Sequence, residues 1–180
     1  FVIYAYIFWV AVGLLFPEDA PKGQGGGAGL RKFSYIISGL LFVTVLSGGF
    51  VAGLKAGLAY NTFPLMGGRW VPEGFLSLEP VWRNFFEDVT TVQFDHRVLA
   101  TLMFILIAAF WVVARKAELL PRVRVALHLF LLFLFIQVTL GISTLLLYVP
   151  TDLAATHQGG ALALFTVSLF LSQQLGRQRI

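Results

Sequence analysis

The stretch FSYIISGLLFVTVLSGGFVAGL, Phe33–Leu54, decides the fold, because it has no charged residue and is long enough to cross a membrane. A spanning helix needs roughly 20 mostly apolar residues. Four further runs lack Asp, Glu, Lys and Arg, namely Phe1–Pro17, Val98–Ala114, Val125–Thr151 and Leu153–Gly176, and all of them except the marginal first one qualify as full spans. Hydrophobic residues fill 58% of the 180 positions and charged residues only 12%, a balance typical of an integral membrane protein. The sequence therefore predicts an all-α, polytopic membrane protein.

The same runs predict how the chain is organised. Residues 1–16 are interpreted as the end of a truncated transmembrane helix that begins outside this chain, and residues 17–32 as a glycine-rich linker on the inner side. Residues 33–176 are expected to form a four-helix transmembrane bundle with a long outer loop at 55–95, followed by an inner tail at 177–180. The chain has no cysteine, which excludes disulfides and thiolate metal sites.

The charges predict the orientation in the membrane. If each run crosses once, nine of the thirteen Lys and Arg residues fall on one side, which is the cytoplasmic or matrix side by the positive-inside rule. The nine are Lys22, Arg31, Lys32, Arg115, Lys116, Arg122, Arg124, Arg177 and Arg179. The net charge of +4 thus reflects topology and contact with membrane lipid, and it does not indicate nucleic-acid binding.

The outer loop is too rich in aromatic residues for a disordered tether. Its segment Pro80–Asp88, PVWRNFFED, is typical of a short amphipathic helix at the membrane surface. A lid over the bundle is the functional interpretation. An aromatic belt is the simpler one, although a belt alone would not need so long a loop.

Two histidines, His96 and His157, stand where the two spans that run inward from the outer face begin. One helical turn further, the same face carries the small residues Ala100 and Gly160. Such a pair could hold a flat macrocycle between two helices, because neutral imidazole is a common axial ligand of haem iron. A single histidine at this depth is more often an interfacial side chain bonded to a carbonyl, whereas the pair favours a shared ligand.

Four neighbouring residues complete the candidate site. Gln93 and Gln158 could fix the imidazoles through hydrogen bonds. Arg97 and Lys55 could pair with the propionates of a haem, although both could equally extend to lipid headgroups. A zinc site is a weaker interpretation, since no third ligand lies nearby. The third histidine, His128, falls near the opposite face and is interpreted as a hydrogen-bonded interfacial side chain.

Four strings closely resemble the haem A synthase family: Ala52–Met66, Thr91–Arg97, Gln137–Pro150 and Leu153–Gln158. The resemblance covers roughly residues 33–175 in order. It implies an eight-helix protein of two pseudo-symmetric four-helix halves, of which this chain matches the carboxy-terminal half. That half is expected to hold a haem b, its iron bound by His96 and His157 as the two axial ligands.

The resemblance also implies the reaction, in which the C8 methyl of haem O is oxidised to a formyl group for cytochrome c oxidase. The implied partners are haem O, haem O synthase and cytochrome c oxidase assembly factors, in a bacterial plasma membrane or a mitochondrial inner membrane. The other half of the family carries a glutamate where this chain has Gln93, and a neutral amide cannot act as a general base. No catalytic residue is therefore assigned here. A bis-histidine membrane cytochrome that carries electrons and a haem-free assembly scaffold or transporter remain alternatives.

Overall fold

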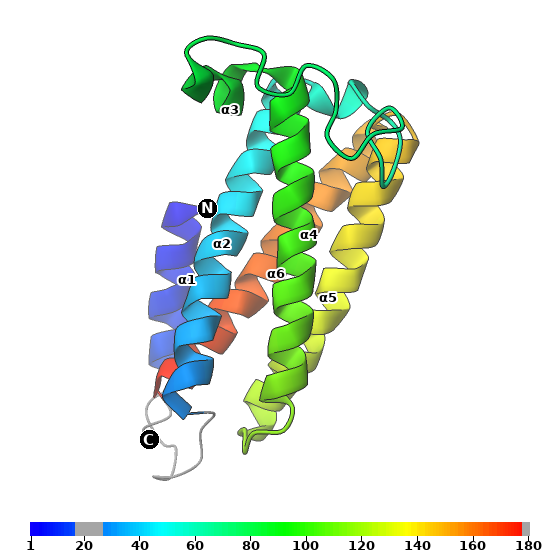
Figure 1. Ribbon diagram of the computed structural model, residues 1–180. Helices are drawn as coiled ribbons and strands as arrows, with labels where there is room; N and C mark the ends of the chain where they lie inside the picture. The colour runs from blue at the N-terminus through cyan, green and yellow to red at the C-terminus, as the bar shows by residue number, and fades with distance from the viewer. Residues whose placement is uncertain (17–26, 178–180) are drawn as a thin grey trace.

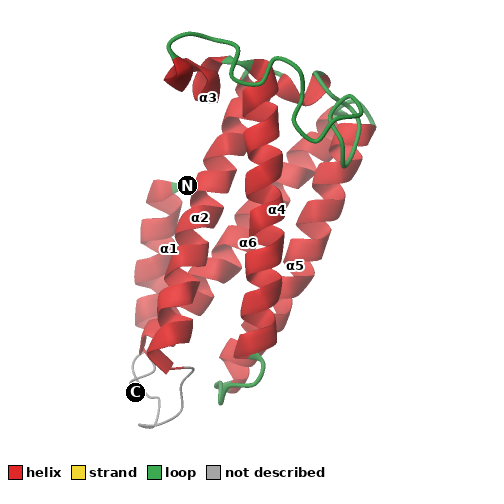
Figure 2. Cartoon of the chain, in the orientation of Figure 1, coloured by secondary structure: helices red, strands yellow, loops and turns green. Residues whose placement is uncertain are grey.

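Four long helices form the body of the protein, whose computed structural model describes residues 1–16 and 27–177 (Figure 1). They are α2 (Gly27–Gly53), α4 (Val89–Ala114), α5 (Pro121–Leu146) and α6 (Thr151–Arg177), and each is long and apolar enough to cross a membrane. A shorter apolar helix, α1 (Val2–Leu15), precedes them. Figure 2 shows helices joined by loops, and no strand occurs among the described residues. The predicted all-α, multi-pass membrane fold is confirmed.

The four long helices pack in a ring. Helix α2 contacts α4 and α6, and α5 contacts the same two helices from the other side, so α4 and α6 lie diagonally opposite. Helix α1 packs on the outside against α6. The chain between α2 and α4 covers one end of the bundle, called the loop end below (Figure 1). The other end, called the basic end, holds the start of α2 and the turn between α4 and α5. Both α4 and α6 run from the loop end to the basic end.

All four long helices begin before the uncharged runs of the sequence, and α4 and α2 extend furthest beyond them. Helix α4 starts at Val89, because the Asp88 side chain accepts a hydrogen bond from the backbone N–H of Thr91 at 2.8 Å and caps the helix. Helix α2 starts at Gly27, so part of the predicted linker is helical. Charged residues mark where the apolar core of a membrane ends, but a helix can continue beyond that point. Residues 17–26 of the linker and 178–180 of the tail lie outside the described residues.

The buried apolar core occupies the half of the bundle next to the basic end. Its outermost members on the four long helices are Leu41, Met103, Leu134 and Leu164, none more than 4% exposed. Between these residues and the loop end, Val92 is the one apolar residue of the four long helices, within the described chain, that is fully buried. The centre of the bundle near the loop end is therefore not filled by a packed apolar core.

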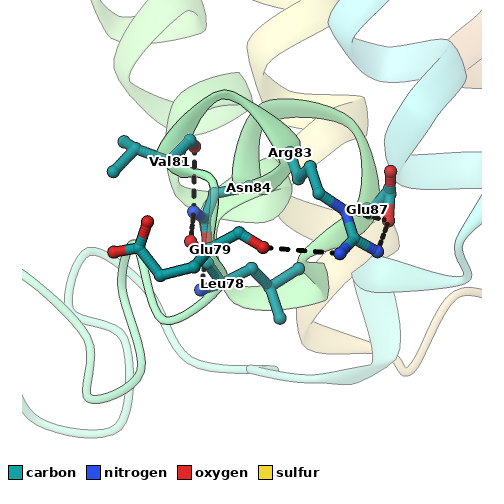
Figure 3. Close-up of polar contacts among 6 residues, drawn as sticks. All are labelled: Leu78, Glu79, Val81, Arg83, Asn84 and Glu87. Atoms are coloured by element: carbon teal, nitrogen blue, oxygen red, sulfur yellow. Dashed lines mark hydrogen bonds and ion pairs between the residues drawn. The ribbon is translucent and has the colours of Figure 1, made fainter.

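The loop at the loop end is ordered. It contains two 3₁₀ turns, η1 (Ala56–Leu58) and η2 (Val81–Arg83), and the one-turn helix α3 (Asn84–Glu87). The fully buried Asn84 side chain holds this segment by accepting from the Leu78 N–H at 2.8 Å and donating to the carbonyls of Leu78 and Val81 (Figure 3). The short helix predicted at Pro80–Asp88 is confirmed in η2 and α3. Its large apolar side chains are exposed, namely Val81, Trp82, Phe85 and Phe86.

Candidate functional site

His96 lies at the start of the third turn of α4 and packs against α2. Its Nδ1 is 2.8 Å from the Ser47 hydroxyl oxygen, and that hydroxyl also donates to the Thr44 carbonyl at 2.7 Å. The imidazole lies directly over Gly48, because a Cβ added there would come within 3.1 Å of the ring atom Cε1. His96 is thus held by the Ser47 hydroxyl and lies close to the backbone at Gly48.

His157 lies in the second turn of α6 and packs against α5. A Cβ added at Gly141 would approach its ring atom Cε1 to 2.8 Å, closer than real Cβ contacts allow. The Gln137 amide donates to the His157 backbone carbonyl at 3.0 Å, and the same nitrogen is 3.5 Å from the ring Nε2. The ring Nδ1 is buried without a hydrogen-bond partner.

The two histidines lie at the same level of the bundle. His96 is seven residues before the core residue Met103, and His157 is seven residues before Leu164. At about 1.5 Å of rise per residue, the backbone of each histidine is about 10.5 Å further along its helix than that core residue, toward the loop end. Their helices are diagonally opposite in the bundle. The structure therefore places the predicted ligand pair at one depth, on opposite sides of the bundle.

This arrangement fits a planar group that takes two protein ligands. The donor set is two imidazoles, one of which has an unpartnered buried ring nitrogen, and the bundle lacks a packed apolar core at this level. Within residues 1–16 and 27–177, no group of three or more His, Cys, Asp or Glu side chains gathers that could hold a metal ion by itself. A haem supplies four iron ligands of its own and needs only the two axial ones from the protein.

Arg97 and Gln93 connect α4 to the loop. The two terminal nitrogens of Arg97 donate to the carbonyls of Thr62 and Tyr60, each at 2.7 Å. Gln93 is 2% exposed, and its amide donates to the same Tyr60 carbonyl at 3.0 Å. Arg97 Nε and Gln93 Oε1 remain buried without partners. Gln93 and Arg97, which the sequence predicted to contact the imidazoles and the propionates, therefore hold the loop to α4. Each still has one buried polar atom without a hydrogen-bond partner.

Lys55 and Gln158, the other two residues predicted for the site, are both exposed. Lys55 lies two residues beyond the end of α2 and precedes η1 in a left-handed conformation, with φ of 54°, and its side chain is exposed. Gln158 is also exposed, although it follows His157 directly in the chain. Neither side chain makes a hydrogen bond or ion pair to another described residue. The amide that contacts His157 belongs instead to Gln137 on the neighbouring helix.

Sequence reasoning missed the four residues that touch the imidazoles. On α2, Gly49 and Gly53 face open space. The close contact is one position earlier, at Gly48. On α5, Gln137 and Gly141 both lie in the string from Gln137 to Pro150 that resembles the family. Nothing in that string distinguishes them from its other residues as contacts of His157. The missed residues are Ser47, Gly48, Gln137 and Gly141.

His128 has the structural role that the sequence predicted for it. Its side chain is exposed toward the basic end of α5, and its Nδ1 accepts a hydrogen bond from the Trp111 indole N–H at 3.1 Å. It lies outside the arrangement around the other two histidines.

Comparison with known proteins gives a consistent result. The family described as "Cytochrome oxidase assembly protein" matches residues 1–169. A protein named "Heme A synthase" from Nitrosospira multiformis is 53% identical over 178 residues, which are 99% of this chain and 50% of that protein. "Heme A synthase COX15" from Homo sapiens is 46% identical over 176 residues, 98% of this chain and 43% of that protein. The chain thus spans about half the length of these relatives. No solved structure matches it.

Proposed function

The chain belongs to the cytochrome oxidase assembly protein family, which includes the haem A synthases, and on that premise we propose that it is the haem b-binding carboxy-terminal half of a haem A synthase. The observation that carries the proposal is the pair of imidazoles of His96 and His157, at one level on diagonal helices, where the bundle has no packed core. Bound there, the haem iron supplies one-electron transfer.

The residues around the pair each have a task in this proposal. His96 and His157 would hold the haem iron through their imidazole nitrogens, which come from diagonally opposite helices. The loop, held to α4 through the Tyr60 carbonyl, covers the end of the bundle and limits access of water. A haem held by these two histidines and shielded by the loop would be suited to passing electrons.

Arg97 is the proposed partner of a haem propionate. An unpaired carboxylate in the apolar membrane is strongly unfavourable, so the carboxylates must be hydrated or paired near the loop end. Arg97 stays charged at all relevant pH values, follows His96 directly, and keeps its Nε without a partner. Because its terminal nitrogens already donate to two carbonyls, it joins loop closure to haem binding. Lys55, exposed between α2 and η1, is the weaker second candidate.

In this proposal the parent protein is an oxidoreductase that converts the C8 methyl of haem O to a formyl group, and the chemistry takes place in its other half. The neutral Gln93 amide, bonded to the loop, offers no general base near the histidines here. Haem O is then the substrate of the other half. Haem O synthase and cytochrome c oxidase assembly factors are the proposed partners, and the basic end is proposed to face the cytoplasm or matrix.

Absorbance spectroscopy of the purified full-length protein tests the proposal. His96→Ala and His157→Ala should each abolish or convert the six-coordinate, low-spin haem b spectrum, because each removes one axial ligand. His128→Ala should leave that spectrum intact, since this residue only bonds to Trp111. Haem b loss in His128→Ala together with an unchanged spectrum in His96→Ala would refute the ligand assignment. A haem-free wild-type protein would support the scaffold alternative instead.

A further inference from the structure

Both imidazoles rest on a glycine of the helix next to their own. His96 of α4 lies over Gly48 of α2, and His157 of α6 lies over Gly141 of α5. Among the described glycines, only these two would bring an added Cβ within 4 Å of a histidine ring, and at the adjacent Gly49 a Cβ would meet nothing within 4 Å. The same device therefore occurs twice, once on each side of the bundle.

The hydrogen bonds at His96 determine which ring nitrogen carries the proton. Ser47 Oγ is close to two acceptor-capable atoms, the Thr44 carbonyl oxygen at 2.7 Å and His96 Nδ1 at 2.8 Å. A carbonyl can only accept, so the single hydroxyl proton of Ser47 goes to Thr44. The Ser47 oxygen then accepts from His96, whose Nδ1 must carry the hydrogen. A neutral imidazole has one N–H, so Nε2 is left with its lone pair free.

His157 is not fixed in this way. Its Nδ1 has no hydrogen-bond partner, and the Gln137 nitrogen at 3.5 Å from Nε2 is too far for a good bond. Gln137 instead holds the His157 backbone carbonyl at 3.0 Å. The side chains around His157 therefore position its backbone and leave the ring tautomer open.

We infer that Ser47 is a positioning residue that holds His96 as the Nδ1–H tautomer over Gly48, so that His96 is the preorganised axial ligand and His157 the adjustable one. This inference rests on the proposed haem b function. An acceptor on the outer imidazole N–H makes the ligand more basic, and a more basic ligand favours ferric over ferrous iron. Ser47 therefore keeps the reduction potential of the bound haem b lower than it would otherwise be.

Potentiometric titration and electron paramagnetic resonance of the full-length holoprotein test the inference. Ser47→Ala should raise the midpoint potential, change the ferric low-spin signal, and weaken haem retention on the order of 10-fold or more, as for other lost outer-shell bonds. Ser47→Thr keeps the hydroxyl and should restore the wild-type values. If Ser47→Ala does not accumulate, Ser47→Cys should show the same upward shift, because a thiol is a poor acceptor.

A matched control is available in the same helix. Ser34 donates to the Arg31 carbonyl at 2.8 Å, the same local bond that Ser47 makes to Thr44, but it contacts no histidine. Ser34→Ala should leave the potential unchanged. Gly48→Ala should also shift the low-spin signal by displacing the ring, whereas Gly49→Ala should not.

The outcomes separate this inference from the proposed function. An unchanged potential in Ser47→Ala, or a Ser47→Thr variant that behaves like Ser47→Ala, would overturn the inference while the ligand assignment stood. If His96→Ala retained the six-coordinate spectrum, the proposed function would fail and the role of Ser47 would fail with it. Equal shifts of the low-spin signal in Gly48→Ala and Gly49→Ala would likewise refute the role of the close contact between His96 and Gly48.

Discussion

Replacing Arg97 with alanine should release the loop from α4 at the point where it covers the bundle. Arg97 makes two charge-assisted hydrogen bonds at 2.7 Å, to the carbonyls of Tyr60 and Thr62. Such bonds contribute about 1.5–3 kcal/mol each. The site is partly exposed, so we use the lower figure and expect a loss of about 3 kcal/mol in the free energy of local opening. That loss corresponds to roughly 100-fold faster exchange of protected amides.

Hydrogen–deuterium exchange of residues 60–66 measures this opening directly. The matched control is Arg69→Ala, which removes an exposed ion pair with Glu73 in the same loop. Exposed pairs contribute at most about 1 kcal/mol, so exchange should change by less than about 10-fold. Equal exchange rates in Arg97→Ala and the wild type would refute the anchoring role. If exchange accelerates and haem b stays as tightly bound as before, the proposed propionate pairing is wrong while the anchor stands.

Three further outcomes are expected. Cysteines introduced at Gly74 should react with reagents added from the outer face and those at Leu120 should not; the reverse pattern would invert the topology. The hydrogen bond from Arg83 lowers the pKa of Glu87. The stabilisation of α3 by this bond should therefore be present above the ordinary pKa of 4.5 and be lost as the pH falls through the lower pKa of the folded state. Amide exchange of α3 measured against pH should show this loss, and Glu87→Gln should abolish the pH dependence. Gln93→Glu should lower the free energy of local loop opening by about 1–3 kcal/mol, because a carboxylate cannot donate a hydrogen bond to the Tyr60 carbonyl that Gln93 binds. Unchanged amide exchange of the loop would contradict a stabilising role for that bond.

The fold was predictable from the sequence because a membrane restricts the alternatives. Four uncharged runs in the sequence correspond to α2, α4, α5 and α6, since backbone groups in an apolar medium must be paired within helices. The depth match between His96 and His157 was also accessible, because a helix converts residue spacing into distance along its axis. The start of α4 was not predicted, although Asp88 followed by Thr91 has the spacing of a helix cap.

The contacts around the imidazoles could not be predicted from spacing along one helix. Ser47 and Gly48 meet His96 only because α2 packs beside α4, and the rotation of one helix against another follows from packing along their whole length. Gln158 was a reasonable candidate because it is adjacent in sequence. Successive residues of a helix point about 100° apart, however, and that turn leaves Gln158 exposed.

Because the apolar core fills only the half of the bundle next to the basic end, the helices can associate before a cofactor binds. Tight packing from Leu41 and Met103 toward the basic end can hold the four helices together by itself, while the segments near the loop end have few buried apolar contacts to keep them closed. Separating those helix tips therefore costs little free energy compared with unfolding the whole bundle. A planar cofactor could enter through this end after the chain is already inserted in the membrane. Its two faces would then fill the centre of the bundle that apolar side chains leave unpacked. Loading would stiffen the protein at the loop end alone, which is also the end where Arg97 ties the loop down.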